Sequence, residues 1–200
     1  MGNLLANPGF ETGKEPWFSM TTDVWVPDFE LSQGVAHAGE AAALLRVDAD
    51  QDTPPTQIWG VSQFVNPEAF PTRLAGWYRV DDWVAGDANQ YVQAVMIVWG
   101  PSPDGEHGNH QIRYLLGGAD EPPFHMPNAR YVGVGTELPP AGEWASFEFA
   151  PAADFQRIWG RIPTEYDRIQ VFFEARFDRR QDRQDPVGGR VYFDDLYVGE

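Results

Sequence analysis

Short strand-like runs separated by turns are the feature that most restricts the fold of this 200-residue chain. About ten runs rich in β-branched and aromatic residues recur between glycine- and proline-containing turns, a spacing typical of β-sandwiches and barrels. The runs occupy residues 23–31, 41–49, 59–65, 73–80, 90–99, 110–116, 129–135, 144–150, 168–178 and 190–198, and only 34–45 and 151–160 could hold a helical turn. The sequence therefore predicts an all-β fold, a jelly-roll β-sandwich of two antiparallel sheets, formed by residues 1–200 as a single domain.

Alternation within three of these runs sorts their side chains into an apolar set and a mixed set. The predicted core set is Leu74, Gly76, Tyr78, Val80, Val92, Ala94, Met96, Val98, Ile169, Val171, Phe173, Ala175 and Phe177. The opposite set combines aromatic rings with hydrogen-bonding groups, and consists of Trp77, Arg79, Tyr91, Gln93, Trp99, Phe172, Glu174 and Arg176. We expect these residues to lie on neighbouring strands of one sheet.

The mixed set suits sugar recognition, because aromatic faces stack on the C–H patches of a pyranose. Glutamine, glutamate and arginine side chains then pair with the equatorial hydroxyls. The alternative is that residues 100–140 fold over this face and make it a second core. Glu174 and Arg176 would then form an ordinary ion pair.

The charge balance disfavours several classes of partner. A formal net charge of −16 argues against nucleic acid and anionic membranes, because phosphate binding needs clustered lysine and arginine. No stretch approaches the roughly 18 apolar residues of a membrane helix. The absence of cysteine excludes disulfides, thiolate zinc sites and cysteine nucleophiles.

The closing run "RVYFDDLYVGE" holds two adjacent carboxylates, Asp194 and Asp195, inside an otherwise apolar strand. Alternation requires one of them to point inward, and a buried carboxylate is costly unless a cation pairs with it. Glu11 follows an Asn-Pro-Gly turn and Glu40 follows a glycine turn, so three carboxylates far apart in sequence stand at expected strand ends. Calcium prefers such hard oxygen ligands. The cation is therefore either a basic side chain or a metal.

The motifs "NLLANPGFETG", "AHAGEAAALLRV", "GVSQFV", "RLAGWYRV" and "VYFDDLYV", in this order, resemble β-jelly-roll carbohydrate-binding modules. These galactose-binding-domain-like modules are often attached to xylanases and other glycanases. The resemblance implies a structural calcium held by Glu11, Glu40 and Asp194, with backbone oxygens near Gly9 and Gly39. It also implies a polysaccharide or oligosaccharide partner and a secreted or cell-surface location.

The predicted function is non-catalytic binding of a neutral polysaccharide or oligosaccharide on the concave face of the sandwich, and no catalytic residue is assigned. One alternative is a glycan-active hydrolase or lyase built on a jelly roll. Hydrolysis needs two carboxylates about 5–10 Å apart, for which Glu174 has Glu148 or Asp178 as a partner. The other alternative is a structural or adhesion domain of a virion or cell surface without a sugar ligand.

Overall fold

The computed structural model describes residues 2–26, 28–85, 89–101, 108–119, 122–133 and 137–200. Within them, one sheet has the strand order β1-β2-β10-β4-β8 and the other has the order β3-β9-β5-β6-β7. The strands of the first sheet are β1 (Glu30–Gln33), β2 (Ala41–Ala49), β10 (Val187–Gly199), β4 (Arg73–Ala85) and β8 (Trp144–Phe149). Those of the second are β3 (Gln57–Val65), β9 (Arg168–Asp178), β5 (Asn89–Trp99), β6 (Gln111–Gly117) and β7 (Ala129–Gly133).

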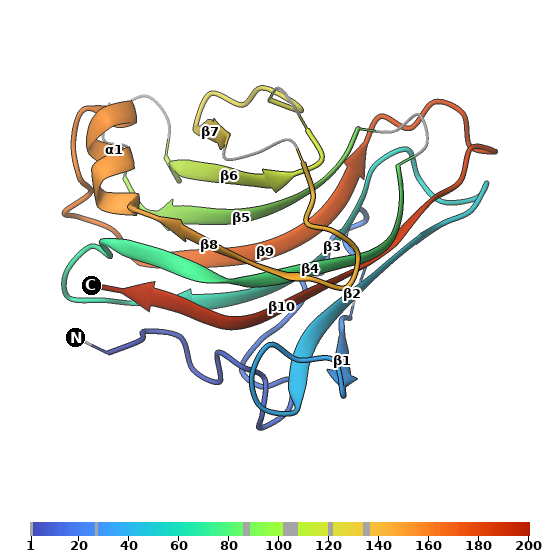
Figure 1. Ribbon diagram of the computed structural model, residues 1–200. Helices are drawn as coiled ribbons and strands as arrows, with labels where there is room; N and C mark the ends of the chain where they lie inside the picture. The colour runs from blue at the N-terminus through green and yellow to red at the C-terminus, as the bar shows by residue number, and fades with distance from the viewer. Residues whose placement is uncertain (1, 27, 86–88, 102–107, 120–121, 134–136) are drawn as a thin grey trace.

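The two sheets face each other as a sandwich (Figure 1), which confirms the predicted jelly-roll β-sandwich. Strand pairs are antiparallel except for β6 and β7, which run parallel. Each of the ten predicted runs overlaps a strand, although run 23–31 shares only Glu30 and Leu31 with β1. Of the two possible helical stretches, 151–160 forms α1 (Pro151–Trp159), which ends at Gly160 in the left-handed conformation. Residues 34–40 instead form a turn into β2.

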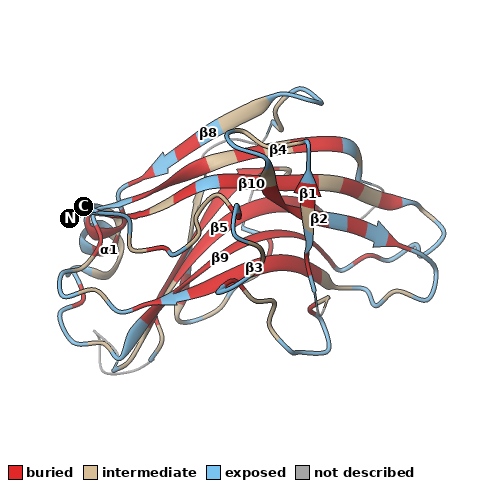
Figure 2. Ribbon diagram, turned by 90° about the horizontal axis from the view of Figure 1, so that it is seen from below, coloured by how far each residue is buried: buried red, intermediate tan, exposed pale blue. Residues whose placement is uncertain are grey.

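The space between the sheets is filled by the predicted apolar set, and this face assignment is confirmed. Phe173 of β9 and Phe193 of β10 meet across the sandwich with ring centroids 5.6 Å apart. The N-terminal segment adds Phe10 and Trp17 to the same core. Figure 2 shows buried residues along the central strands of both sheets. Because the inner faces form the core, the surfaces open to a ligand are the outer faces of the sheets and the loops.

The two ends of the chain lie side by side (Figure 1). The Leu4 N–H donates to the Val198 carbonyl at 2.7 Å, and the Leu196 N–H donates to the Pro8 carbonyl at 3.1 Å. The pairing of β10 with β4 is interrupted by a bulge between Asp194 and Tyr197, where Asp195 has a φ of 47°. Within the described residues, no helix is long and apolar enough to span a membrane.

Candidate functional site

The outer face of sheet β3-β9-β5-β6-β7 carries most of the predicted ligand-binding residues. Cross-strand pairing places Tyr91 opposite Arg176 and Gln93 opposite Glu174. The six predicted residues on this sheet are Tyr91, Gln93, Trp99, Phe172, Glu174 and Arg176. Alternation along β5 and β9 therefore brings all six to one face, as expected.

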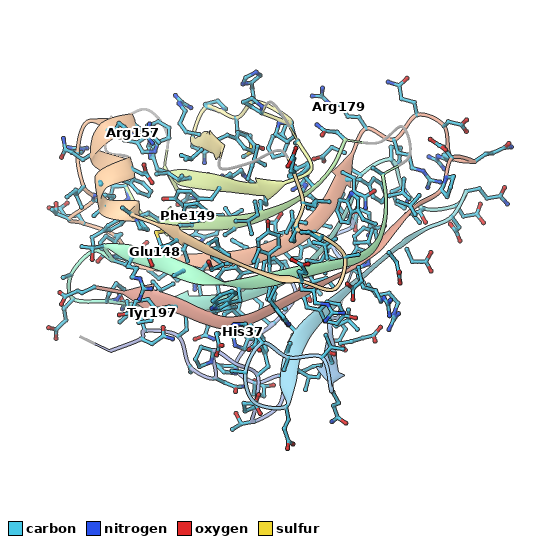
Figure 3. All side chains as sticks on the ribbon, viewed as in Figure 1. His37, Glu148, Phe149, Arg157, Arg179 and Tyr197 are labelled. Atoms are coloured by element: carbon cyan, nitrogen blue, oxygen red, sulfur yellow. The ribbon has the colours of Figure 1, made fainter. Side chains whose placement is uncertain are left out.

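Trp77 and Arg79 do not belong to that face, so the expectation of a single sheet is wrong for them. Both lie on β4 in the opposite sheet. Trp77 stacks on His37 with ring centroids 3.9 Å apart, and Arg79 pairs with Asp81 at 2.8 Å. Figure 3 shows His37 beside sheet β1-β2-β10-β4-β8. Alternation shows which side of a strand faces the core. The same alternation occurs in strands of either sheet, so it does not show to which sheet a strand belongs.

A buried polar network occupies one end of the face. The Arg176 guanidinium lies 2.6 Å from Asp178 Oδ1 and 3.6 Å from Glu174 Oε2. The Tyr91 hydroxyl donates to Asp178 at 2.6 Å, and Gln93 Nε2 donates to Glu174 at 2.8 Å. Burial opposes the charge on Arg176, but Glu174, Tyr91 and Asp178 outweigh it, so the pKa of Arg176 is raised. These contacts hold the side chains of Tyr91, Gln93, Glu174, Arg176 and Asp178 in place at this end of the outer face.

The side chains of Arg113, Phe124 and Tyr131 cover this end. The Phe124 ring lies 5.1 Å from the guanidinium carbons of both Arg113 and Arg176. Tyr131 packs against the small apolar cluster that contains Tyr91. The alternative expectation, that part of 100–140 folds over the face and makes a second core, is thus confirmed for this end. We name the region formed by Gln93, Arg113, Phe124, Tyr131, Glu174, Arg176 and Asp178 the covered end.

The other end of the face is more open. Trp99 is half-buried, and its indole N–H donates to Gln170 Oε1 at 2.9 Å. The Arg168 guanidinium carbon lies 5.6 Å from the Trp99 ring and 4.0 Å from the Phe64 ring. Phe18 stacks on Phe64 at 5.4 Å. Both rings contact Arg168, but Phe64 also stacks on Phe18, whereas Trp99 is the larger ring and is held by its hydrogen bond to Gln170. We name Phe64, Trp99, Arg168 and Gln170 the open end.

Sequence reasoning missed Arg113, Phe124 and Tyr131. Alternation in β6 does place Gln111, Arg113 and Leu115 on one side and Ile112, Tyr114 and Leu116 on the other. That pattern was a usable signal for Arg113. The position of Phe124 had no such signal, because it lies between strands, where no periodicity applies.

Asp194, the predicted inward carboxylate, is fully buried, whereas Asp195 is exposed. The Oδ2 atom of Asp194 accepts hydrogen bonds from the backbone N–H groups of His37 at 2.7 Å and Ala38 at 3.2 Å. Its Oδ1 atom accepts one from the backbone N–H of Asp195 at 2.7 Å. Burial raises the pKa of Asp194 even though these three donors lower it. The expectation that one of the two aspartates points inward is confirmed.

The Glu11 carboxylate lies close to this position. Its Oε1 accepts the backbone N–H groups of Glu40 and Ala41, each at 3.0 Å. A Cβ built on Gly9 would lie 3.4 Å from Asp194 Oδ1, 3.8 Å from Asp195 Oδ1 and 3.9 Å from Glu11 Cγ. The carboxylates of Asp194 and Asp195 therefore lie beside Gly9 together with a methylene of Glu11, while the Glu11 carboxylate itself lies against Gly39.

The fit of this region to calcium depends on backbone oxygens as well as carboxylates. Glu40 is exposed and reaches Glu11 through its backbone N–H. Among the residues that the structure describes, no group of three or more histidine, aspartate or glutamate side chains could hold a metal on its own. A calcium here would need carbonyl oxygens from the turns to complete its six to eight ligands. The calcium site stays a prediction.

No family model matches the chain, and no curated protein is significantly similar to it in sequence. Solved structures do match. The TmCBM61 module in complex with beta-1,4-galactotriose has a TM-score of 0.50 at 19% identity, covering 99% of this chain and 98% of that one. The non-crystalline cellulose specific module CBM28 has a TM-score of 0.50 at 12% identity, covering 100% and 96%.

A third structure is the enzymatically active domain of bacteriophage CBA120 tailspike protein 4, with a TM-score of 0.51 at 12% identity. The match covers 98% of this chain but 21% of the tailspike chain. These similarities confirm the fold: the chain has the β-sandwich of carbohydrate-binding modules. The predicted resemblance is confirmed at that level.

Proposed function

We propose that this chain is a non-catalytic carbohydrate-binding module that takes a neutral polysaccharide or oligosaccharide on the outer face of sheet β3-β9-β5-β6-β7. The observation that carries the proposal is the open end, where the half-buried Trp99 ring lies beside Gln170 and Arg168. A sugar ring stacked on Trp99 would bring its hydroxyls within reach of the exposed Arg168 guanidinium, while the buried Gln170 amide, bonded to Trp99 and Ser62, holds the indole in place. The cellulose and galactotriose named for the structural neighbours add support.

The carboxylates of the face favour binding over hydrolysis. Glu174 and Asp178 are both buried and both paired with Arg176, which removes them as a free acid and base. Glu148, the other partner considered for Glu174, lies on β8 of the opposite sheet and pairs with Arg73 (Figure 3). A glycoside hydrolase needs two carboxylates on either side of one bond. Because one structural neighbour is an enzymatically active domain, the test below includes turnover.

The same proposal includes a structural calcium between the chain ends. Glu11 and Asp194 would supply carboxylate ligands, with carbonyl oxygens of the two turns, and exposed Glu40 is the third candidate. Bound calcium would neutralise the buried Asp194, whose ionised form burial disfavours. A secreted or cell-surface location is part of this proposal.

The test of glycan binding is affinity electrophoresis on cellulose, xylan, galactan and β-glucan derivatives, followed by calorimetry on any hit. We expect Trp99→Ala to weaken binding by about 2 kcal/mol, or about thirtyfold in Kd, as for a central aromatic contact. Trp77→Ala is the matched control on the opposite sheet and should change Kd less than about twofold. Each variant needs an unchanged melting temperature for this comparison.

Other outcomes would redirect the proposal. A large loss in Trp77→Ala with no loss in Trp99→Ala would move the site to the outer face of the other sheet. Absence of binding to all of these glycans, with the fold intact, would favour the structural or adhesion domain. Turnover of a bound glycan that disappears in Glu174→Gln would identify an enzyme.

A further inference from the structure

Three buried polar atoms at the covered end have no hydrogen-bond partner in the described part of the chain: Gln93 Oε1, Arg113 Nη1 and the Tyr131 hydroxyl. Gln93 is 0% exposed and Arg113 is 8% exposed. Buried polar side chains in folded proteins nearly always have a partner, because an unmade hydrogen bond costs the desolvation of the group. These three atoms therefore remain able to bond to a bound molecule or to ordered water.

The three atoms come from adjacent strands. Arg113 of β6 pairs in register with Tyr131 of β7 and with Val95 of β5. Gln93 is two residues before Val95 on the same face, which makes it a diagonal neighbour of Arg113. Phe124 lies over the group, with its ring centroid 5.6 Å from that of Tyr131. The three residues are thus neighbours on the outer face of the sheet, and Phe124 packs against Arg113 and Tyr131.

The charges around this region balance. Glu174 and Asp178 supply two negative charges, and Arg176 and Arg113 supply two positive ones. Burial raises the pKa of Tyr131 to about 12, and all four of these charges act on its hydroxyl. Among the described residues, the hydrogen bond of Arg113 goes to a neutral group, with Nε donating to Gln111 Oε1 at 2.9 Å. A balanced cluster does not require an ionic ligand, and an added carboxylate would face two others already buried there.

The unpaired atoms match a pair of neighbouring hydroxyls. Gln93 Oε1 accepts a hydrogen bond, Arg113 Nη1 donates one, and the Tyr131 hydroxyl does either. Each hydroxyl of a vicinal diol also donates and accepts, so such a diol satisfies all three atoms. The Phe124 ring, which contacts Arg113 and Arg176, would leave these guanidinium groups to pack on the C–H face of the same sugar.

We propose that the covered end is a subsite for the vicinal diol of one neutral sugar residue, held by Gln93, Arg113 and Tyr131 beneath Phe124. This inference rests on the proposed function, namely that this face binds a glycan, and it adds the chemistry of the sugar residue. Entry requires Phe124 and its neighbours to move aside. The subsite therefore takes the end or a branch of a chain, whereas the open end takes the sugars that follow.

The test uses β-1,4-galactotriose, cellotriose and xylotriose as probes, with Kd measured by calorimetry on the whole chain. Tyr131→Phe should weaken the best-bound trisaccharide about fivefold, the effect of one neutral hydrogen bond. Its melting temperature should not fall, because the hydroxyl has no hydrogen-bond partner among the residues that the structure describes. The control Tyr197→Phe removes a hydroxyl on β10 that bonds to the Glu200 carbonyl, and should leave Kd unchanged.

Deoxygenated forms of the best-bound trisaccharide locate the hydroxyl concerned. Removal of the hydroxyl that meets Tyr131 should weaken binding to the native chain but not weaken it further in Tyr131→Phe. Galactotriose and cellotriose oxidised to uronates at C6 should bind at least about tenfold more weakly than the neutral forms, since their carboxylates meet Glu174 and Asp178.

The outcomes separate the two proposals. If no neutral trisaccharide binds, the proposed function fails and this inference fails with it. If binding is lost in Trp99→Ala but unchanged in Tyr131→Phe, the face binds glycans while water satisfies the three buried atoms, and only the subsite is overturned. Tighter binding of the uronates would overturn the assignment to a neutral sugar.

Discussion

Loss of the Arg176 guanidinium is the sharpest test of how the covered end is stabilised. The side chains of Arg176, Glu174 and Asp178 have relative exposures of only 7%, 3% and 7%. Arg176→Met keeps most of the apolar stem but leaves two carboxylates buried without their cation. Breaking a buried ion pair by removing one partner costs about 3–5 kcal/mol, because the remaining charge is neither hydrated nor paired.

A surface pair provides the matched control. Arg73 lies 2.7 Å from Glu148, but the two side chains are 45% and 64% exposed. Water solvates both groups after Arg73→Met, so the expected loss is below about 1 kcal/mol. For a chain of about 200 residues, 1 kcal/mol shifts the melting temperature by about 2–4 °C. Arg176→Met should therefore lower it by about 6–20 °C and Arg73→Met by less than about 4 °C, with matching shifts in the urea midpoint.

A rescue variant tests the mechanism behind this difference. Replacing Glu174 by Gln and Asp178 by Asn in the Arg176→Met background removes both orphaned charges while keeping groups that Gln93 and Tyr91 can bond. We expect the triple variant to recover at least half of the lost stability. Equal losses for Arg176→Met and Arg73→Met would refute the reasoning. So would a triple variant no more stable than the single one.

Three further predictions concern other parts of the fold. Burial raises the pKa values of Tyr91 and Tyr114 above the ordinary value of 10.0, so the native state holds these protons more tightly than the unfolded chain does. Stability should be complete below about pH 10 and fall above it, with tyrosinate absorbance from both residues appearing only as the chain unfolds. Gly39→Ala should cost about 2 kcal/mol in urea unfolding, since Gly39 has a φ of 69° and a Cβ there would overlap the Glu11 carboxylate. Chelation should lower the melting temperature of the native chain but not that of Asp194→Asn, and identical curves with and without chelator would count against calcium.

The side of each strand that faces the core was predictable because that property is local. Ile169, Phe173 and Phe177 alternate with residues whose side chains lie on the outer face of the sheet, and a strand turns alternate side chains to opposite sides wherever it lies. The sheet to which a strand belongs is not local. Consecutive strands β4 and β5 lie in different sheets, so Trp77 and Trp99 face away from the core in opposite directions. No pattern within either strand distinguishes that arrangement from a hairpin.

The proposed glycan-binding face was predictable only where strands form it. Gln93 and Glu174 meet because β5 and β9 pair, and both were singled out from their alternation. Phe124 reaches the face from a segment between β6 and β7, whose path depends on packing against Arg113 and Arg176. Whether the face is open or covered is set by this packing, and the sequence therefore left both alternatives open.

The buried carboxylates show why the presence of a metal is harder to predict than burial itself. Burying a carboxylate requires compensation, and Glu174 and Asp178 obtain it from Arg176. Asp194 obtains it from three backbone N–H groups, each worth about 1.5–3 kcal/mol when the acceptor is charged. Together they approach the several kcal/mol that an ion loses on burial. Because burial still raises the pKa of Asp194, this compensation is incomplete, and a calcium ion shared with Glu11 would supply the remainder.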